Sequence, residues 1–224
     1  LCKKTLIQGV IDCYYINADD SITLLDFKTD NVSKTNGEKI MYDVVVIGGG
    51  VVGAFIAREL SKYNIKIALL EKCNDCAMGA TKANSAIVHA GFDAVPGTLK
   101  AKLNVRGVEL MKKVCSELHV PLKNNEALVV AFSNDEMPHL NELLERGVKN
   151  GVPELRIVNR EELVKLEPNI GDTAVGALVA PTSSIVCPYE LTIAGVENAV
   201  TNGAEFIRNC EVKGIRYEND EFIL

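Results

Sequence analysis

The pattern of hydrophobic and polar positions changes near Met41. Before that point, two runs rich in β-forming residues, 5–16 and 22–27, flank a polar stretch and predict a β-hairpin. Residues 29–39 are polar and have no periodicity, so they predict a linker. After Met41, apolar strand patterns alternate with amphipathic helix patterns, which is typical of an α/β fold.

The region after Met41 opens with a predicted strand over 42–47, a helix over 51–63 and a second strand over 65–70. Next come a predicted helix over 99–118, a strand over 127–132, a helix after a capping box at Ser133 and Glu136, and a short helix after the same pattern at Asn159 and Glu162. A strand is predicted over 175–180, and short strands near 206, 212–217 and 222–224. Between them, a helix is predicted from Pro188 to Asn202-Gly203, with apolar residues at helical spacing: Tyr189, Ile193, Val196 and Val200.

The composition argues against several classes of function, among them broad nucleic-acid binding and membrane spanning. With 47% hydrophobic and 24% charged residues, the chain has the balance of a soluble globular protein. A net charge of −6 disfavours a broad nucleic-acid surface, which needs clustered Lys and Arg. No apolar run reaches the roughly 20 residues of a membrane span, and no export signal is visible, so we expect a cytoplasmic protein.

The cysteines suit reduced thiols better than a disulfide framework, because their number, seven, is odd and they are scattered. Only Cys73 and Cys76 have the spacing of a metal or redox pair. A zinc site needs a second pair of ligands, which the sequence does not offer. We therefore predict a loop with two ordinary thiols.

A glycine motif follows the first strand after Met41. Gly48, Gly50 and Gly53 match G-x-G-x-x-G, between an apolar strand and an amphipathic helix. Gly48 is expected to make the tight turn, Gly50 to let the backbone approach a pyrophosphate, and Gly53 to let helix and sheet pack closely. The start of the helix then offers free N–H groups and the positive end of its dipole to the phosphates.

Glu71 closes the second strand, about 20 residues after the motif, where a carboxylate can accept hydrogen bonds from ribose hydroxyls. The same charge would repel a 2′-phosphate, so FAD or NAD is favoured over NADP. The alternative, a glycine-rich turn without a ligand, does not explain why motif, strand, helix and Glu71 occur together.

A second motif, residues 83–91 with 96–103, reads ANSAIVHAG and PGTLKAKL. With the glycine motif and Glu71, it makes the chain from Met41 on resemble the D-amino-acid-oxidase-like superfamily of FAD-dependent oxidoreductases, and within it the L-2-hydroxyglutarate and glycerol-3-phosphate dehydrogenases. The resemblance implies a Rossmann-like α/β FAD-binding domain with an inserted α+β substrate domain, truncated at the C-terminus. The implied division is 41–118 for the first part of the FAD-binding domain, 119–187 for the substrate domain and 188–224 for the return to the FAD-binding domain.

The resemblance also implies roles for single residues. Thr81, Asn84 and Ser85 would line FAD near the pyrophosphate, and the backbone of a strand carrying Val212 would contact adenine. His89 would lie near the flavin ring and take the substrate hydroxyl proton as hydride moves to the flavin; alternatively, it is a packing histidine. The implied activity is oxidation of a small 2-hydroxy acid or polyol phosphate, with the electron acceptor left open.

The first forty residues carry a different resemblance. Residues 9–12 and 25–30 resemble the nuclease core at the end of the RecB and AddA helicase–nucleases. If the polar stretch between the two runs forms the turn at its centre, Asp12 opposes Asp26 and Lys28 lies on the same face. Two opposed carboxylates can share a Mg²⁺ while a lysine assists the attacking water. The alternatives are therefore the nuclease end of a DNA-repair helicase–nuclease, or a hairpin with a solvated polar face.

Overall fold

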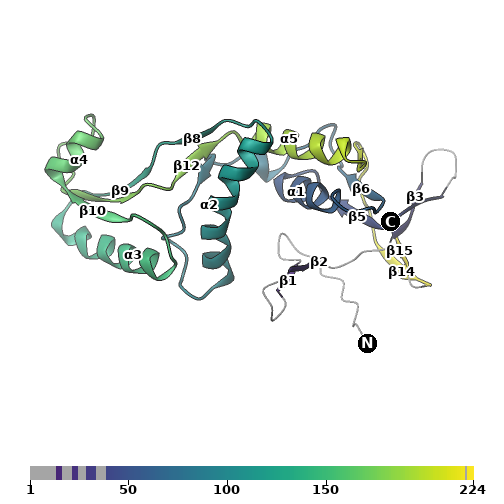
Figure 1. Cartoon of the computed structure of the whole chain (residues 1–224), viewed down its shortest axis with the longest axis horizontal. Coiled ribbons are helices and arrows are strands. Elements are labelled where there is room, and N and C mark those ends of the chain that lie inside the picture. The colour runs from purple at the N-terminus through teal and green to yellow at the C-terminus, as the bar shows by residue number, and fades with distance from the viewer. Residues whose placement is uncertain (1–13, 17–21, 25–28, 34–38, 220) are drawn as a thin grey trace. The chain divides into compact units, whose positions relative to one another are not determined.

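The computed structural model of the chain describes residues 14–16, 22–24, 29–33, 39–219 and 221–224 (Figure 1). The chain divides into two compact units. The first comprises the residues up to Ala83 together with Pro188–Leu224, and the second is Asn84–Cys187.

A parallel sheet with strand order β13-β6-β5 forms the centre of the first unit. The strands of this sheet are β5 (Val44–Ile47), β6 (Ile67–Leu70) and β13 (Glu205–Ile207). Two helices of the same unit are α1 (Val51–Leu60) and α5 (Pro188–Thr201). The helices α1 and α5 lie side by side against one face of this sheet (Figure 1). The predicted βαβ opening is therefore confirmed.

Alternation along the strands explains the two apolar layers of this sheet. Val46 and Leu69 pack with α1 and α5 on one face, whereas Val45 and Ala68 belong to a separate cluster on the other. Successive side chains of a strand point to opposite faces, so a continuous apolar run buries both faces of the sheet.

The α5 helix begins at Pro188 as predicted, but its buried face differs from the predicted one. Of the four predicted apolar positions only Val196 is buried, whereas Tyr189, Ile193 and Val200 are exposed. The helix packs through small residues instead: a Cβ atom on Gly195 would lie 3.3 Å from the Phe55 ring. Close packing against α1 thus selects the face that carries small side chains.

A second sheet of the first unit has the order β14-β15-β3-β4. Its strands are β3 (Thr29–Ser33), β4 (Lys39–Tyr42), β14 (Arg216–Glu218) and β15 (Glu221–Ile223). The prediction of a linker over 29–39 is wrong, because β3 pairs with β4 and with β15. Strand formation here depends on a partner near the other end of the sequence, which local periodicity does not report. The predicted boundary between 40 and 41 accordingly falls inside β4.

The predicted hairpin is confirmed where it is described. The strands β1 (Tyr14–Ile16) and β2 (Ile22–Leu24) pair antiparallel, with Ile16 opposite Ile22. This register is the one expected for a turn at the centre of the polar stretch. Asp12, Asp26 and Lys28 lie outside the described residues.

The second unit contains two antiparallel sheets with the orders β10-β11-β9 and β7-β12-β8. Their strands are β7 (Ile87–Val88), β8 (Leu122–Asn124), β9 (Ala127–Ala131), β10 (Arg156–Asn159), β11 (Gly176–Ala180) and β12 (Ser184–Val186), and the helices are α2 (Leu99–Glu117), α3 (Met137–Lys149) and α4 (Arg160–Leu166). Leu178 packs with α3 on one face of the β11 strand, and Val179 packs with α4 on the other.

The first boundary between the units lies at Ala83, not at the predicted Leu118. Residues after Ala83 join the second unit because β7 pairs with β12 and Ala90 packs against Ala180. The Asn150 amide also donates to the Gly91 carbonyl at 3.0 Å. The second boundary between the units lies between Cys187 and Pro188.

The two predicted helix caps have different outcomes. The Asn159 side chain accepts a hydrogen bond from the Glu162 N–H at 3.0 Å, which confirms that cap. Ser133 makes no side-chain cap bond, and the Glu136 carboxylate accepts from the Phe132 N–H instead. A 3₁₀ turn over 134–136 precedes α3, so the predicted capping box is wrong. In the part of the chain that the structure describes, no helix has the length and apolar character needed to cross a bilayer.

Candidate functional site

The glycine motif forms the turn between β5 and α1. At two positions of this turn, the backbone geometry requires glycine. Gly48 has φ +106°, a conformation that L side chains rarely adopt, and its N–H donates to the Leu70 carbonyl at 2.7 Å. A Cβ atom on Gly53 would overlap the Gly48 carbonyl oxygen. The tight turn and the close approach of the helix therefore depend on Gly48 and Gly53, in agreement with the roles predicted from the motif.

Gly50 and Thr81 meet at the start of α1. Gly50 is the N-cap residue, and a Cβ atom there would lie 3.2 Å from the Thr81 hydroxyl oxygen. That oxygen accepts a hydrogen bond from the Val51 N–H at 3.1 Å. Thr81 lies in the 3₁₀ turn η1 (Ala80–Lys82), so the structure brings a residue distant in sequence to the N-terminus of the helix, where an anion would be stabilised.

Glu71 joins the end of β6 to the glycine turn. The side chain is buried, with 8% of its surface exposed. One carboxylate oxygen accepts from the Gly49 N–H at 2.7 Å, and the other accepts from the Cys73 N–H at 2.8 Å. A carboxylate offers about four acceptor positions, so these two bonds leave capacity for the two hydroxyls of a ribose.

Sequence reasoning missed the role of Gly49, which occupies a variable position of the motif. A Cβ atom there would lie 3.1 Å from both Cβ and Oε2 of Glu71. The available signal was the run of three glycines from Gly48 to Gly50, because the motif itself requires only the outer two.

The environment of Glu71 favours its ionised form. Burial by itself raises the pKa of the carboxyl, but hydrogen bonds from the Cys73 and Gly49 N–H groups outweigh it and hold the pKa below its usual value. The hydrogen bond with Glu71 raises the pKa of the Cys73 thiol. At neutral pH the site therefore contains a buried carboxylate beside an uncharged thiol.

The segment after β13 runs past Glu71 and differs from the prediction. Val212 lies between β13 and β14 and belongs to neither strand, so its predicted place on a strand is wrong. It is half-buried against the cluster of Tyr42 and Val45. Instead, two hydrogen bonds of the Glu71 backbone continue the pairing of β13 with β6. The Glu71 N–H donates to the Ile207 carbonyl and the Cys210 N–H donates to the Glu71 carbonyl, both at 2.9 Å.

Asn84, Ser85 and His89 belong to the second unit. Asn84 and Ser85 are exposed, and the Asn84 side-chain oxygen accepts from the Ala86 N–H at 2.8 Å. His89 follows β7 with an exposed side chain, and its carbonyl accepts a hydrogen bond from the Asn104 amide. The first part of the second motif thus forms a loop and a short strand that ends at Val88, directly before His89.

The Cys73–Cys76 loop contains free thiols. Burial raises the pKa of the Cys76 thiol to about 11, so it is protonated at neutral pH. Among the residues that the structure describes, no group of three or more His, Cys, Asp or Glu side chains could hold a metal ion. The proposed metal ligands Asp12 and Asp26 lie outside those residues.

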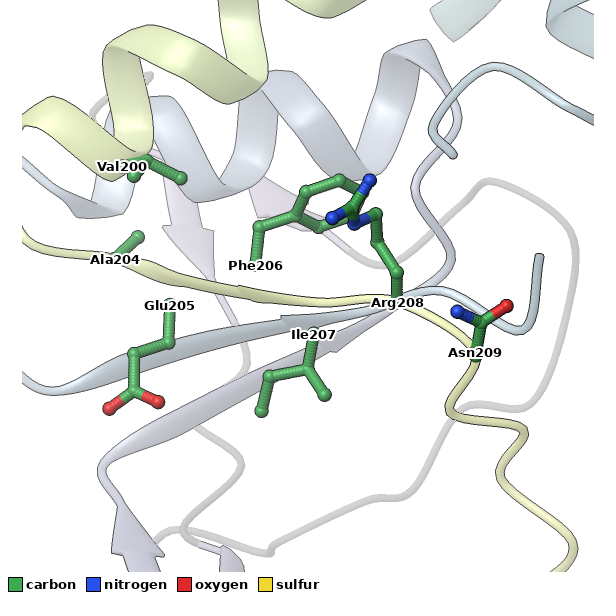
Figure 2. Close-up of a pocket in the computed structure, with 7 residues that line it drawn as sticks. All are labelled: Val200, Ala204, Glu205, Phe206, Ile207, Arg208 and Asn209. Atoms are coloured by element: carbon green, nitrogen blue, oxygen red, sulfur yellow. The ribbon is translucent and has the colours of Figure 1, made fainter. Parts of the chain in front are cut away.

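A shallow hollow of about 510 Å³ follows β13 and is lined by Val200 and residues 204–209. Figure 2 shows Phe206 and Arg208 on one side of the strand and Glu205 and Ile207 on the other. The β6 strand separates β13 from β5, so this hollow is distinct from the glycine turn. The site chemistry described above lies at the turn and not in the hollow.

Three similarities to known proteins agree with this geometry. Residues 43–224 match the family described as FAD dependent oxidoreductase. The chain is 53% identical over 175 residues to a glycerol 3-phosphate dehydrogenase of Caloramator mitchellensis, covering 78% of this chain and 36% of that protein. It is 35% identical over 176 residues to the human mitochondrial L-2-hydroxyglutarate dehydrogenase, covering 78% of this chain and 38% of that protein.

The structure is also similar to that of the dithionite-reduced L-α-glycerophosphate oxidase of Mycoplasma pneumoniae with FAD bound. The TM-score is 0.76 and the sequence identity 32%, over 80% of this chain and 47% of that one. The chain therefore spans less than half the length of each of these relatives.

Proposed function

Because the chain belongs to the FAD-dependent oxidoreductase family, we propose that it binds FAD and takes part in oxidising a small 2-hydroxy acid or polyol phosphate. The observation that carries this proposal is the linked geometry of Gly48, Gly53 and Glu71, which forms a turn suited to a dinucleotide. The relatives named for glycerol 3-phosphate and L-2-hydroxyglutarate support the substrate class. The complete activity is proposed for the protein extended to the length of these relatives.

In this proposal the first unit holds the ADP portion of the cofactor. The N-terminus of α1 faces the pyrophosphate, with Gly50 leaving the approach open and Thr81 fixing the Val51 N–H. Glu71 accepts hydrogen bonds from the ribose hydroxyls through the acceptor positions that Gly49 and Cys73 leave available. The half-buried segment around Val212 lies beside adenine.

Three residues of the segment 84–89 have proposed roles near the flavin ring. Bound FAD would supply the acceptor for the hydride that leaves the substrate carbon. His89 takes the proton of the substrate hydroxyl, which its exposed imidazole can accept when neutral. Asn84 and Ser85 add polar groups to the cofactor-lining loop.

Colour tests this proposal directly. The chain extended to the length of its relatives should purify yellow, and Gly50→Val should abolish the colour because the side chain would fill the space of the pyrophosphate. The matched control is Gly171→Val, since a Cβ atom at Gly171 meets nothing within 4 Å and the residue lies in the second unit, away from the glycine turn in sequence. A colourless extended protein that binds NADH in a fluorescence titration would contradict the FAD assignment.

The nuclease alternative gains no support. Its residues Asp12, Asp26 and Lys28 lie outside both the described residues and the matched range 43–224. We therefore retain the oxidoreductase as the proposed function.

A further inference from the structure

The backbone on both sides of His89 is buried, although its ring is exposed. Val88 precedes it in β7 and is 9% exposed, and Ala90 follows it and is 1% exposed. The His89 side chain lies between them on the accessible side. The position of the imidazole therefore depends on how the backbone of residues 88–91 is held.

The α2 helix holds this segment at two residues. The Asn104 side-chain amide donates to the His89 carbonyl. Gly91 has φ +108°, which L side chains rarely adopt, and a Cβ atom there would lie 2.9 Å from Cγ2 of Val105. The backbone thus turns at Gly91 in close contact with α2.

The α3 helix holds the residues that follow, mainly through Asn150, its C-cap residue. The Asn150 side-chain amide donates to the Gly91 carbonyl at 3.0 Å and to the Ala94 carbonyl at 2.7 Å. One side chain therefore bonds both ends of the segment 91–94, which is 56–59 residues away in the sequence.

Two further residues of α3 contact the middle of this segment. Arg146, one turn before Asn150, donates to the Asp93 carbonyl at 3.0 Å. A Cβ atom on Gly147 would lie 2.9 Å from the Cβ atom of Phe92. The last turn of α3 therefore contacts each of the four residues 91–94.

Asn150 acts on the segment through its two N–H donors alone. Its side-chain oxygen is shielded from solvent and has no hydrogen-bond partner among the residues that the structure describes. An ionised carboxylate has the same shape as the amide but only accepts hydrogen bonds. Replacing Asn150 by Asp would therefore remove both bonds and place an oxygen against two carbonyl oxygens.

We propose that Asn150 is a positioning residue for His89. It holds the Gly91 carbonyl two residues after His89, while Asn104 holds the carbonyl of His89 itself, so the backbone that carries the imidazole is bonded to both helices. A displacement of about 1 Å in a catalytic group can lower a rate by up to about a hundred-fold. The inference rests on the proposed function only for the proton-accepting role of His89, since the contacts belong to the second unit alone.

The first test uses the chain as it is. In Asn150→Asp, the ¹⁵N order parameters of the backbone amides of residues 89–94 should fall from the roughly 0.85 of rigid backbone toward about 0.6. The matched control is Asn141→Asp, the same change in the same helix. The Asn141 amide donates to the Met137 carbonyl within α3, so the order parameters of residues 89–94 should not change.

Two further variants keep this test decisive. If Asn150→Asp does not fold, Asn150→Ala removes the two bonds without setting an oxygen against the carbonyls, and the same fall is expected. Asn104→Ala removes only the exposed bond to the His89 carbonyl and should loosen His89 by a smaller amount. Unchanged order parameters in a folded Asn150 variant would overturn the proposal.

Activity of the extended protein separates positioning from a merely structural role. Asn150→Asp should lower kcat about ten-fold with little change in KM or flavin content, which is part of the effect of a positioned general base. Asn141→Asp should keep the parent kcat. A merely structural role predicts a lower melting temperature and an unchanged kcat at temperatures where the variant is folded.

The outcomes distinguish this inference from the proposed function. A yellow, active protein whose Asn150→Asp variant keeps its kcat would overturn the positioning role and leave the proposed function standing. A colourless extended protein would contradict the proposed function, and with it the role of His89 that Asn150 is proposed to support.

Discussion

The two units differ in how their candidate site residues are positioned. In the first, the backbone requirements of Gly48 and Gly53 and the carboxylate of Glu71 fix the turn within a single βαβ segment. In the second, the short strand β7 that precedes His89 is held by β12, a strand that follows much later in the chain. A turn that is determined locally can be identified from a motif, whereas the strand that pairs with β7 is known only once the fold is known.

The largest expected effect tests the local side of this comparison. Gly53→Ala should lower the free energy of unfolding by about 3 kcal/mol, because the added methyl group overlaps the backbone oxygen of Gly48 and the turn must shift. Urea unfolding of the chain measures this loss. Gly107→Ala is the matched control: it lies within α2 with nothing within 4 Å of its added Cβ, and we expect it to be neutral or stabilising by roughly 0.5–1 kcal/mol. Equal stabilities for the two variants would show that the turn is not locally constrained.

A smaller effect concerns the carboxylate that holds the turn. Glu71→Gln should lower the free energy of unfolding by about 1.5–3 kcal/mol at neutral pH, since it weakens charge-assisted hydrogen bonds from two N–H groups. Folding lowers the pKa of Glu71 from its ordinary value of 4.5, so this stabilisation is present above that value and is lost as the pH falls through the lower folded pKa. The difference between parent and variant should therefore shrink below about pH 4.5. A difference that is constant from pH 7 to pH 3 would count against the ionised, hydrogen-bonded Glu71.

The smallest expected effect concerns two helix caps, and it tests whether the second unit also contains locally determined features. Asn159→Ala should cost about 1 kcal/mol because it removes the cap of α4. Ser133→Ala should change stability by less than about 0.5 kcal/mol, since Ser133 makes no cap bond at η2. The sequence pattern predicts equal losses of stability for the two variants, whereas the structure predicts a loss only for Asn159→Ala. Thermal unfolding of both variants decides between these expectations.

Much of the first unit was accessible from the sequence because its signals are short-range. The apolar strand Val44–Ile47, the glycines after it and the proline that opens α5 each report on their own neighbourhood, and these elements are confirmed. Gly49 was missed because its requirement comes from Glu71, which the motif does not relate to it. The roles of Thr81, Asn84, Ser85 and His89 toward a cofactor stay predictions.

Two of the failed predictions share one physical cause. The β3 strand forms because β15 is there to pair with it, and the first boundary lies at Ala83 because β7 pairs with β12. Val212 was assigned to a strand from its apolar neighbourhood, but the strand begins at Arg216. The outcomes for β3 and for the first boundary depend on contacts between distant segments, and a reading of local periodicity has no access to them.

The bond between Glu71 and the Gly49 N–H has a further consequence for ligand capture. It connects the ends of two neighbouring strands through groups of the protein alone, so the turn is preorganised by the fold itself. The conformational entropy of ordering this loop is lost during folding and not again during association, which leaves more of the contact energy as affinity. Free and occupied forms should then have nearly superimposable turn backbones, as in complexes that associate as rigid bodies.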